Sequence, residues 1–382
     1  MKENASVVTI AEVTDRRRLR DWLKVPFIVF EGDPLWTPQL DFMEKRRISP
    51  KHAPFFTFGE AAFFVAYRNN EPVGRISAQI NRRHLDRYRD DTGHFGFFDC
   101  LNDKEAAGKL VATAADWLRS RGMKRMLGPV SLSLNEETGC LVDGFDTIEA
   151  LMMPRARQWT GPLLESTGLQ KEMDVYAYRF VRGAKVPDKI LRLAAGERDT
   201  QRIGYRPFDV KRYDEEVRRV FDIANQAWAA NWGFVPFSDA EIKAVASEMK
   251  PLITDDFGGF AVFEGREVGF IIGVPNLNEA IAGFGGKLLP FNWLKLLRTI
   301  RARRFKTFRV PLMGMLPEFQ STPRGGAVLG FLFGKFSDHV ARFDPDWSEM
   351  SWILDNNPRM KRLAQMIGGP PPKTYRLYAK PI

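Results

Sequence analysis

The stretch that decides the fold runs from Glu349 to Gly369, EMSWILDNNPRMKRLAQMIGG, and continues as KTYRLY at Lys373–Tyr378. Its pattern predicts a strand, an asparagine cap, a short helix that stops at glycine, and a final strand that ends on tyrosines. An earlier stretch repeats this pattern, with LLESTG at 163–168 followed by DVYAY at 174–178. Two copies of one unit in one chain predict a duplicated domain.

Two hairpin patterns support the duplication. FFVAYRNNEPVGRI at 63–76 and GFAVFEGREVGFII at 259–272 both read as strand, polar turn and strand. Val268 lies 195 residues after Val73, and Gly368 lies 200 residues after Gly168. Two landmarks in the same order at nearly the same offset indicate an internal repeat.

The elements between these landmarks predict an α/β fold. In the first half, an aromatic strand at 93–99 precedes a helix at 103–121, which Gly122 ends. The second half opens with a helix from Asp214 to Asn231. Each half is therefore predicted to be a mixed, mostly antiparallel sheet flanked by helices. The predicted segments are an N-terminal domain at 1–182, a connection at 183–207 with a short helix at 189–195, and a C-terminal domain at 208–382 with an insertion at 279–309.

Composition indicates an ordinary globular protein. At 382 residues the chain is long enough for two domains, and 44% of its residues are hydrophobic. The sequence has no signal-peptide pattern and no apolar stretch that could span a bilayer, so we expect a cytoplasmic location. Its net charge of +10 permits an anionic membrane surface or a polyanion as a partner.

Cysteine and histidine usage favours neither a disulfide nor a metal. We expect Cys100 and Cys140 to be free and reduced, although a disulfide between them is the alternative. The four histidines are scattered, without metal-ligand spacing, so no metal is expected. The sequence also has no apparent Ser-His-Asp or Cys-His arrangement for covalent catalysis.

A glycine turn in the second half is a candidate anion site. The strand at 308–315 is followed by LPEFQSTPRGGA at 316–327 and then by an apolar helix at 328–340. Such a turn directs backbone N–H groups and the positive end of the helix dipole outward, which suits a pyrophosphate. Arg324 would add a charge-assisted contact. The alternative is a plain turn before a helix.

The order of these elements resembles the GNAT acyltransferase fold. In that family a Gln/Arg-x-x-Gly-x-Gly/Ala turn holds the pyrophosphate of coenzyme A, and here its place is taken, with irregular spacing, by Gln320, Arg324, Gly325, Gly326 and Ala327. The resemblance implies that acyl-CoA is the co-substrate and that its pantetheine arm runs beside Met313 to Leu316, including Met315. It also implies that Asn356 contributes to the cofactor site and that Tyr375 protonates the leaving thiolate.

The first copy matches this pattern less well. Three acids, Asp99, Asp103 and Glu105, lie where a phosphate would bind. Carboxylates repel a pyrophosphate, so we expect the first copy to be degenerate and the second copy to hold the thioester.

Two further segments are candidates for the acceptor side. At the end of a predicted strand, Asn135 and Glu136 lie in a glycine-bounded polar stretch, and Glu136 is the candidate base that deprotonates the amine. The alternative there is a solvated loop. Asn231, Trp232 and Phe234 lie at a helix end and form a candidate pocket wall, in which Asn231 is the polar anchor and a candidate catalytic residue; core packing is the alternative.

The insertion contains a basic amphipathic segment. Residues 287–309 hold eight basic side chains and no acid, together with apolar residues such as Phe291, Leu297 and Ile300. This pattern is typical of a helix on an anionic bilayer, and a packed surface helix is the alternative. No nucleic-acid recognition motif accompanies the charge. The candidate membrane-binding residues are Trp293, Lys295, Arg298, Arg301, Arg303 and Arg304.

The whole chain resembles a family of bacterial tandem-GNAT proteins, and this resemblance extends to the bacterial ceramide synthases. The matching stretches include FIVFEGDPLW at 27–36, PVGRI at 72–76 and NWGF at 231–234, together with PNLN at 275–278 and SWIL at 351–354. The resemblance implies transfer of a long acyl chain from acyl-CoA to a sphingoid-base amine at the inner face of the cytoplasmic membrane. The alternatives are an N-acyltransferase for a soluble amine and a non-catalytic lipid-binding or regulatory protein.

Overall fold

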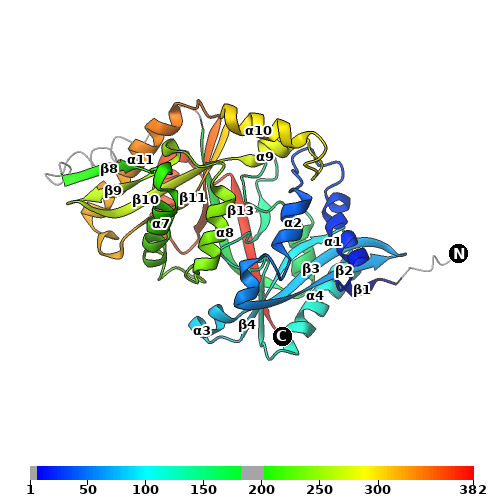
Figure 1. Ribbon diagram of the computed structural model, residues 1–382. Coiled ribbons are helices and arrows are strands. Elements are labelled where there is room, and N and C mark those ends of the chain that lie inside the picture. The colour runs from blue at the N-terminus through cyan, green and yellow to red at the C-terminus, as the bar shows by residue number, and fades with distance from the viewer. Residues whose placement is uncertain (1–6, 182–201) are drawn as a thin grey trace. The chain divides into compact units, whose positions relative to one another are not determined.

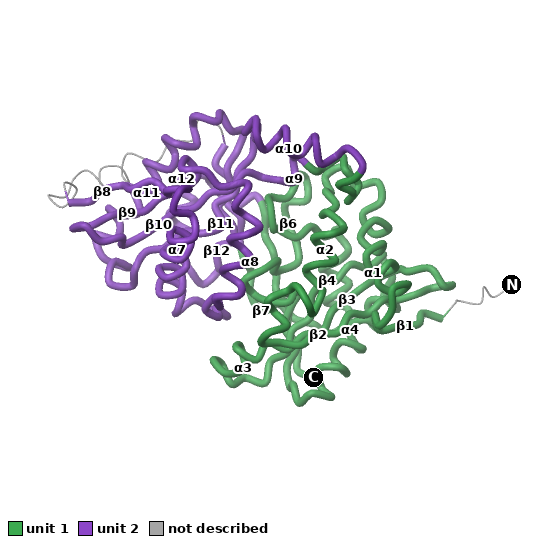
Figure 2. The backbone as a smooth tube through the Cα atoms, in the orientation of Figure 1, with its two compact units in different colours: residues 1–175, 281–289, 373–382 green, residues 176–280, 290–372 purple. Residues whose placement is uncertain are grey.

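A computed structural model describes residues 7–181 and 202–382 (Figure 1). The chain forms two compact units, which Figure 2 distinguishes by colour. Unit 1 consists of residues 1–175, 281–289 and 373–382, and unit 2 consists of residues 176–280 and 290–372. The units therefore do not follow the predicted halves, because the last strand of the chain belongs to unit 1.

Unit 1 is an open sheet with helices packed against it. Its strand order is β1-β2-β3-β4-β5-β13-β7, with β6 paired to β13. The β4–β5 pair is parallel, and β13 runs antiparallel to β5. The elements are β1 (Thr9–Glu12), α1 (Arg16–Val29), α2 (Asp41–Arg47), β2 (Gly59–Arg68), β3 (Glu71–Asn81), α3 (Arg82–Tyr88), β4 (Thr92–Cys100), α4 (Lys104–Arg119), β5 (Arg125–Gly128), β6 (Cys140–Asp143), α5 (Thr160–Ser166), the first part of β7 (Gln170–Val181) and β13 (Lys373–Pro381).

Unit 2 has a sheet of the same kind. Its strand order is β7-β12-β11-β10-β9-β8, to which β7 contributes its residues from Tyr176 onward. The β11–β12 pair is parallel. The elements are β8 (Ile203–Pro207), α7 (Tyr213–Ala227), α8 (Asp239–Met249), β9 (Gly258–Phe263), β10 (Arg266–Pro275), α9 (Leu277–Ile281), α10 (Asn292–Ala302), β11 (Thr307–Met315), the 3₁₀ turn η5 (Pro317–Phe319), α11 (Pro323–Ala341), β12 (Trp347–Leu354) and α12 (Pro358–Gly368).

The two units repeat one arrangement of elements. In each, a hairpin leads to a strand, a helix and a parallel strand: β2-β3-β4-α4-β5 in unit 1 and β9-β10-β11-α11-β12 in unit 2. The hairpin turns also match in conformation. Asn69 and Asn70 have φ of 53° and 64°, and Glu264 and Gly265 have φ of 50° and 80°. Two successive positive φ angles fit the twist of a tight hairpin, so the predicted internal repeat has a structural counterpart.

Local signals place most helix boundaries. Asp103 caps α4 through its side chain, which accepts from the Ala106 N–H, and the helix buries Leu110, Val111 and Leu118. The predicted helix at 103–121 is thus confirmed with a slightly earlier end. Helix α7 ends at Ala227, before the predicted Asn231.

Some sequence predictions fall where the chain is not described or has another structure. The predicted helix at 189–195 and most of the predicted connection lie outside the described residues. Residues 203–207, assigned to that connection, form β8 and pair with β9. In the described ranges 7–181 and 202–382, no helix is long and apolar enough to cross a bilayer. Both cysteines are buried and free, as predicted.

Candidate functional site

An opening between β11 and β12 is the centre of the candidate site in unit 2. The two parallel strands pair from Thr307 with Trp347 to Val310 with Met350, where their register ends. The register of β11 with β10 continues to Met315. Pro311 has no N–H to donate, which helps to end the parallel pairing at this point. Residues 311–315 of β11 therefore have no strand partner on the side of β12.

Buried polar side chains hold the base of this opening. The Arg309 Nε donates to Ser351 Oγ at 3.0 Å, and its Nη2 donates to the Ser351 carbonyl at 3.1 Å. Ser351 Oγ donates to Glu349 at 3.0 Å, and Arg179 Nε donates to the same carboxylate at 2.9 Å. The guanidinium of Arg309 thus satisfies a β12 carbonyl at the point where the strands part.

The predicted glycine turn at 316–327 is shorter in the structure, because α11 begins at Pro323 rather than at 328 and Gly325 and Gly326 lie in its first turn. Thr322 caps the helix, accepting from the Gly325 N–H at 3.0 Å. A Cβ on Gly325 would lie 1.9 Å from the Phe319 carbonyl oxygen, whereas a Cβ on Gly326 would meet nothing within 4 Å. Gly325 and Ala327 fit the Gly-x-Ala part of the family pattern, which puts Thr322 in the place of its Gln or Arg. The positive end of the α11 dipole therefore lies beside the opening.

The other predicted cofactor residues have distinct places around this turn. The Gln320 amide donates to the carbonyls of Ala227 at 2.9 Å and Met315 at 3.0 Å. These hydrogen bonds connect the segment after β11 to the end of α7. Arg324 is exposed and Ala327 is fully buried. Asn356 is exposed in the turn after β12, where its neighbour Asn357 caps α12.

The aromatic segment after α7 is attached to the same edge of β11. Trp228 Nε1 donates to the Met313 carbonyl at 3.2 Å and packs edge-on against Phe234, with ring centroids 5.8 Å apart. Phe234 is buried, in agreement with core packing at that position. Asn231 and Trp232 are only half-buried, so they remain candidates for a pocket wall.

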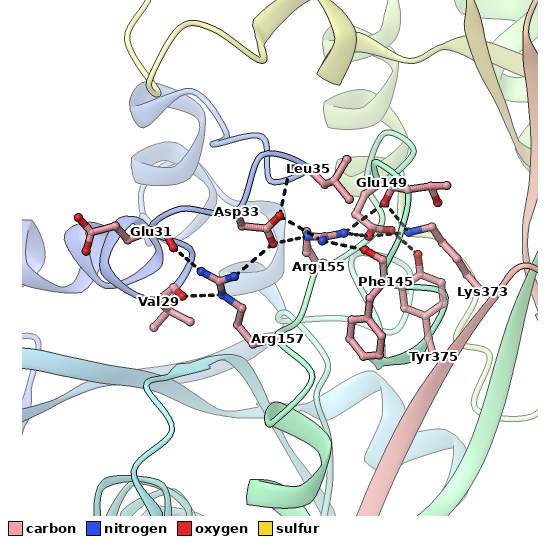
Figure 3. Close-up of polar contacts among 11 residues, drawn as sticks. Val29, Glu31, Asp33, Leu35, Phe145, Glu149, Arg155, Arg157, Lys373 and Tyr375 are labelled. Atoms are coloured by element: carbon pink, nitrogen blue, oxygen red, sulfur yellow. Dashed lines mark hydrogen bonds and ion pairs between the residues drawn. The ribbon is translucent and has the colours of Figure 1, made fainter.

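Tyr375 lies in unit 1, on β13, rather than in the unit that contains the glycine turn. Its side chain is fully buried, and its hydroxyl donates to Glu149 at 2.6 Å. Figure 3 shows the surrounding network, in which Lys373 and Arg155 also bind Glu149, at 2.7 and 3.1 Å, and Arg155 binds Asp33. These contacts fix the last strand in the sheet of unit 1.

Sequence reasoning missed the tyrosine that β7 contributes to unit 2. The Tyr176 hydroxyl donates to Asp355 at 3.1 Å, in the turn that precedes α12, and Lys361 pairs with Asp355 at 2.5 Å. The signal is present in the sequence, because DVYAY at 174–178 repeats the pattern of the terminal strand. Which unit each copy would join was not apparent.

The equivalent opening in unit 1 is filled by its own chain. After β5, the Val130 N–H donates to the Phe95 carbonyl at 2.7 Å, and Val130 forms a bridge with Thr138. The intervening loop buries Leu132, and a Cβ on Gly96 would lie 2.0 Å from the Val130 oxygen. Residues of the loop after β5 therefore occupy this edge of β4, and the absence of a thioester site in the first copy stays a prediction.

The three acids expected to repel phosphate have partners in unit 1. Asp99 pairs with Arg75 at 2.7 Å, and Asp103 and Glu105 both pair with Arg68 at 2.8 Å. The pKa of Asp99 is raised by burial, although Arg75 partly offsets this shift. The negative charges of these three acids are therefore balanced by arginines of the same unit.

Glu136 belongs to a cluster that the sequence did not reveal. The Arg47 side chain pairs with Glu136 at 3.0 Å, with Glu137 at 2.9 Å and with Glu44 at 3.6 Å. Burial raises the pKa of Glu44, and the Arg47 charge opposes this shift. Asn135, in the same loop, donates its backbone N–H to Ser133 Oγ at 3.2 Å. Glu44 and Arg47 come from α2, a helix without a recognisable motif.

Sequence comparison finds two curated relatives along nearly the whole chain. The chain is 35% identical over 388 residues to the bacterial ceramide synthase of Caulobacter vibrioides, covering 98% of each protein. It is also 35% identical over 368 residues to protein YghO of Escherichia coli, covering 96% of this chain and 94% of that protein. No protein-family model matches the chain.

Solved structures share the fold. A tandem GNAT protein from the clavulanic acid biosynthesis pathway matches 98% of both chains with a TM-score of 0.55 and 11% identity. A GCN5-related N-acetyltransferase from Sphaerobacter thermophilus matches 98% of this chain and 95% of that one, with a TM-score of 0.53 and 12% identity. The predicted tandem GNAT-like fold is therefore confirmed.

Proposed function

Because the chain belongs to the family that includes the bacterial ceramide synthase of Caulobacter vibrioides, we propose that it is an acyl-CoA-dependent N-acyltransferase that forms ceramide or dihydroceramide. The acyl donor is a long-chain acyl-CoA, and the acceptor is the amino group of a sphingoid base. The tandem GNAT fold supports acyl transfer to nitrogen as the reaction class.

The observation that carries this proposal is the opening between β11 and β12 beside the N-terminus of α11. The edge of β11 from Pro311 to Met315 does not pair with β12 and would run beside a pantetheine arm, while its Met313 and Met315 carbonyls accept from Trp228 and Gln320. The first turn of α11, with the positive end of the helix dipole and exposed Arg324, suits the pyrophosphate, although the N–H groups of Gly325 and Gly326 already donate to Thr322. In this arrangement Met313 and Met315 lie beside the arm.

The chemistry requires a free amine and a leaving thiolate. The nitrogen lone pair attacks the thioester carbonyl carbon, the tetrahedral intermediate collapses with cleavage of the C–S bond, and the nitrogen loses a proton to a base. Glu136, the base expected from the sequence, lies in unit 1 and pairs with Arg47 at 3.0 Å, so it is not assigned to the opening in unit 2. Tyr176 is better placed than Tyr375 to protonate the leaving thiolate in unit 2, since its hydroxyl contacts the turn before α12. Neither the attack of the amine nor the collapse of the tetrahedral intermediate needs a covalent bond between the acyl group and the enzyme.

We further propose that α10 attaches the protein to the cytoplasmic face of the inner membrane. Phe291, Trp293 and Leu294 are 74%, 43% and 44% exposed, respectively. Ile300 of the predicted apolar stripe packs on the core of unit 2, together with Leu296, so the stripe is divided between the core and the surface. The exposed basic residues Lys295, Arg298, Arg301, Arg303 and Arg304 suit anionic lipid headgroups.

The test is thiol release from palmitoyl-CoA by the full chain, with sphinganine or soluble amines as acceptors. We expect release with sphinganine, and mass spectrometry should identify the N-acyl product. Release only with amino acids or other soluble amines would favour the small-amine alternative. If no amine or acyl chain length supports release, while palmitoyl-CoA still binds, the protein is a binding protein rather than a transferase.

A further inference from the structure

Helix α2 of unit 1 has two faces of different character. Glu44 and Arg47 lie on the inner face, where both are half-buried and pair with each other at 3.6 Å. Phe42, Lys45 and Arg46 follow the i, i+3, i+4 spacing of a single helical face, and all three are exposed. The outer face of α2 therefore presents an aromatic ring beside two cations.

A loop from the second half of the sequence packs against the start of this helix. The loop, residues 281–289, belongs to unit 1 (Figure 2). The Asp41 N–H donates to the Gly286 carbonyl at 2.8 Å, and a Cβ on Gly286 would lie 2.7 Å from Asp41 Oδ1. Phe284 is buried, whereas Leu289 is exposed. The loop thus adds a second apolar side chain to the surface of unit 1, a few residues from its contact with α2.

The exposed charges of these two segments are basic. In residues 41–52 and 281–289, the exposed lysine and arginine side chains are Lys45, Arg46, Lys51 and Lys287. The two carboxylates, Asp41 and Glu44, are half-buried. Exposed cations next to exposed apolar side chains suit a bilayer with anionic headgroups. A second copy of the chain, related by a two-fold axis, would instead bring these cations against one another, which costs free energy.

Exposed apolar side chains are concentrated in this part of the chain. Of the nine large apolar side chains that are exposed in the ranges 7–181 and 202–382, four lie between Leu289 and Leu294, and Phe42 is a fifth. Single exposed apolar residues are ordinary on soluble proteins, but a run of them marks an interaction surface. Leu289 is separated by one residue from Phe291, at which the proposed α10 contact begins. The two surfaces are therefore continuous along the chain.

We propose that Phe42, Lys45 and Arg46 of α2, together with Lys287 and Leu289, form a surface of unit 1 that binds an anionic bilayer. This α2 surface rests on the proposed function only in that its partner is the same membrane. The two apolar side chains enter the headgroup region, and the cations bind lipid phosphates. Unit 1 thus has a bilayer contact of its own, in addition to the contact through α10.

The experiment places the fluorophore nitrobenzoxadiazole on single introduced cysteines of the full chain. Both native cysteines are buried, and burial raises the pKa of each thiol to about 12, so an exposed cysteine reacts first. Phe42→Cys and Leu289→Cys carry the label in the α2 surface. Val7→Cys is the matched control, since Val7 is 70% exposed and Leu289 is 72% exposed in the same unit.

Vesicles of phosphatidylglycerol and phosphatidylcholine should change the emission of two of these labels. We expect the labels at positions 42 and 289 to brighten and to shift to shorter wavelength, as they do in an apolar environment, while the label at position 7 keeps its aqueous emission. Vesicles of phosphatidylcholine alone should give a smaller change, because the cations then lack anionic lipid. Aqueous emission at positions 42 and 289 in vesicle-bound protein would overturn the proposal.

Serine variants measure the contribution of the apolar side chains. Phe42→Ser and Leu289→Ser should each weaken binding to anionic vesicles about tenfold, the factor expected from the burial of one such side chain. Val7→Ser should bind as the wild type does. The melting temperature should change little in all three variants, because the side chains are exposed. If the substitutions dissociate a dimer in sedimentation velocity and leave vesicle binding unchanged, the surface joins two copies and the proposal is wrong.

Two further measurements separate this inference from the proposed function. A label at Trp293→Cys reports on α10, and thiol release from palmitoyl-CoA with sphinganine reports on the reaction. A response at position 293 together with thiol release, but without a response at positions 42 and 289, contradicts only the α2 surface. A response at positions 42 and 289 without thiol release from any acyl-CoA contradicts only the proposed reaction. Absence of vesicle binding by the wild type overturns both membrane contacts, and thiol release still decides the reaction.

Discussion

At the scale of single residues, Gly325 has the most demanding position in the candidate site. We predict that Gly325→Ala lowers the free energy of unfolding by about 1–3 kcal/mol and weakens CoA binding, because its Cβ would lie 1.9 Å from a backbone oxygen of η5. Gly326→Ala is the control, since that Cβ meets nothing within 4 Å. Thermal melts and CoA titrations of both variants check this. Equal losses in the two variants would show that the close approach is unimportant.

His94 makes stability depend on pH. Its ring is buried, and neither ring nitrogen has a hydrogen-bond partner among the residues described. Burial, and then the charge of His84, lowers its pKa to about 3. Below about pH 6.5 the unfolded chain binds a proton that the folded chain does not, so stability falls as the pH drops from about 6.5 to about 3.

We predict that His94→Gln removes up to about 1.4 kcal/mol per pH unit from this dependence. Urea melts at several pH values between 4 and 7 measure the slope. His52→Gln, at an exposed position, is the control and should keep the wild-type slope. A His94→Gln slope equal to that of the wild type would rule out the buried imidazole as the cause.

At the scale of elements, α10 carries a prediction about membranes. Replacing Arg301, Arg303 and Arg304 by glutamine should weaken binding to vesicles that contain anionic lipid by about 3 kcal/mol, since each basic residue near such a surface contributes about 1 kcal/mol. Flotation with phosphatidylglycerol vesicles at several salt concentrations measures this. Added salt should weaken wild-type binding more than variant binding.

Two substitutions on the same helix provide the comparison. Trp293→Ser should reduce flotation without changing the melting temperature much, because Trp293 is 43% exposed. Ile300→Ser should lower the melting temperature instead, because Ile300 packs on the core of unit 2. If the wild type does not float, α10 is a surface helix with a solvated basic face.

At the scale of the whole molecule, the end of the chain is part of unit 1. Deleting residues 373–382 removes β13 from between β5 and β7, so we predict that unit 1 unfolds although the truncation lies in the second half of the sequence. Hydrogen exchange should show lost protection in β2 to β5. Retained protection there would mean that unit 1 does not need its last strand.

A single substitution at Lys373 tests the attachment of β13 to unit 1 without removing the strand. Lys373→Met leaves buried Glu149 without one of its cations, and we expect a loss of about 3–5 kcal/mol. Lys380→Met, on the same strand, removes only a half-buried contact with the Thr167 carbonyl and should cost less. Similar losses in both variants would contradict a special role for the Glu149 network.

Much of the fold was predictable because its signals are local. The paired asparagines at 69 and 70 specify a tight hairpin turn and Asp103 caps its own helix, whereas the glycines predicted to precede the helix after β11 lie in the first turn of α11. The repeat was visible because both copies keep their elements in the same order. The candidate cofactor edge at Met313 and Met315 followed from the family resemblance that this order carries. The Glu136 cluster did not, because Glu136 meets Arg47 across a separation of 89 residues.

The sequence by itself determined two copies of one α/β unit, their hairpins and the glycine turn of the second copy, since each depends on neighbouring residues. Only the tertiary structure decided that β13 joins unit 1, that Tyr176 serves unit 2 and that the first opening is filled by its own loop. The physical reason is that strand pairing is non-local. The two terminal strands have nearly the same pattern, so either fits either sheet, and long-range contacts such as the buried pair of Tyr375 with Glu149 decide between them.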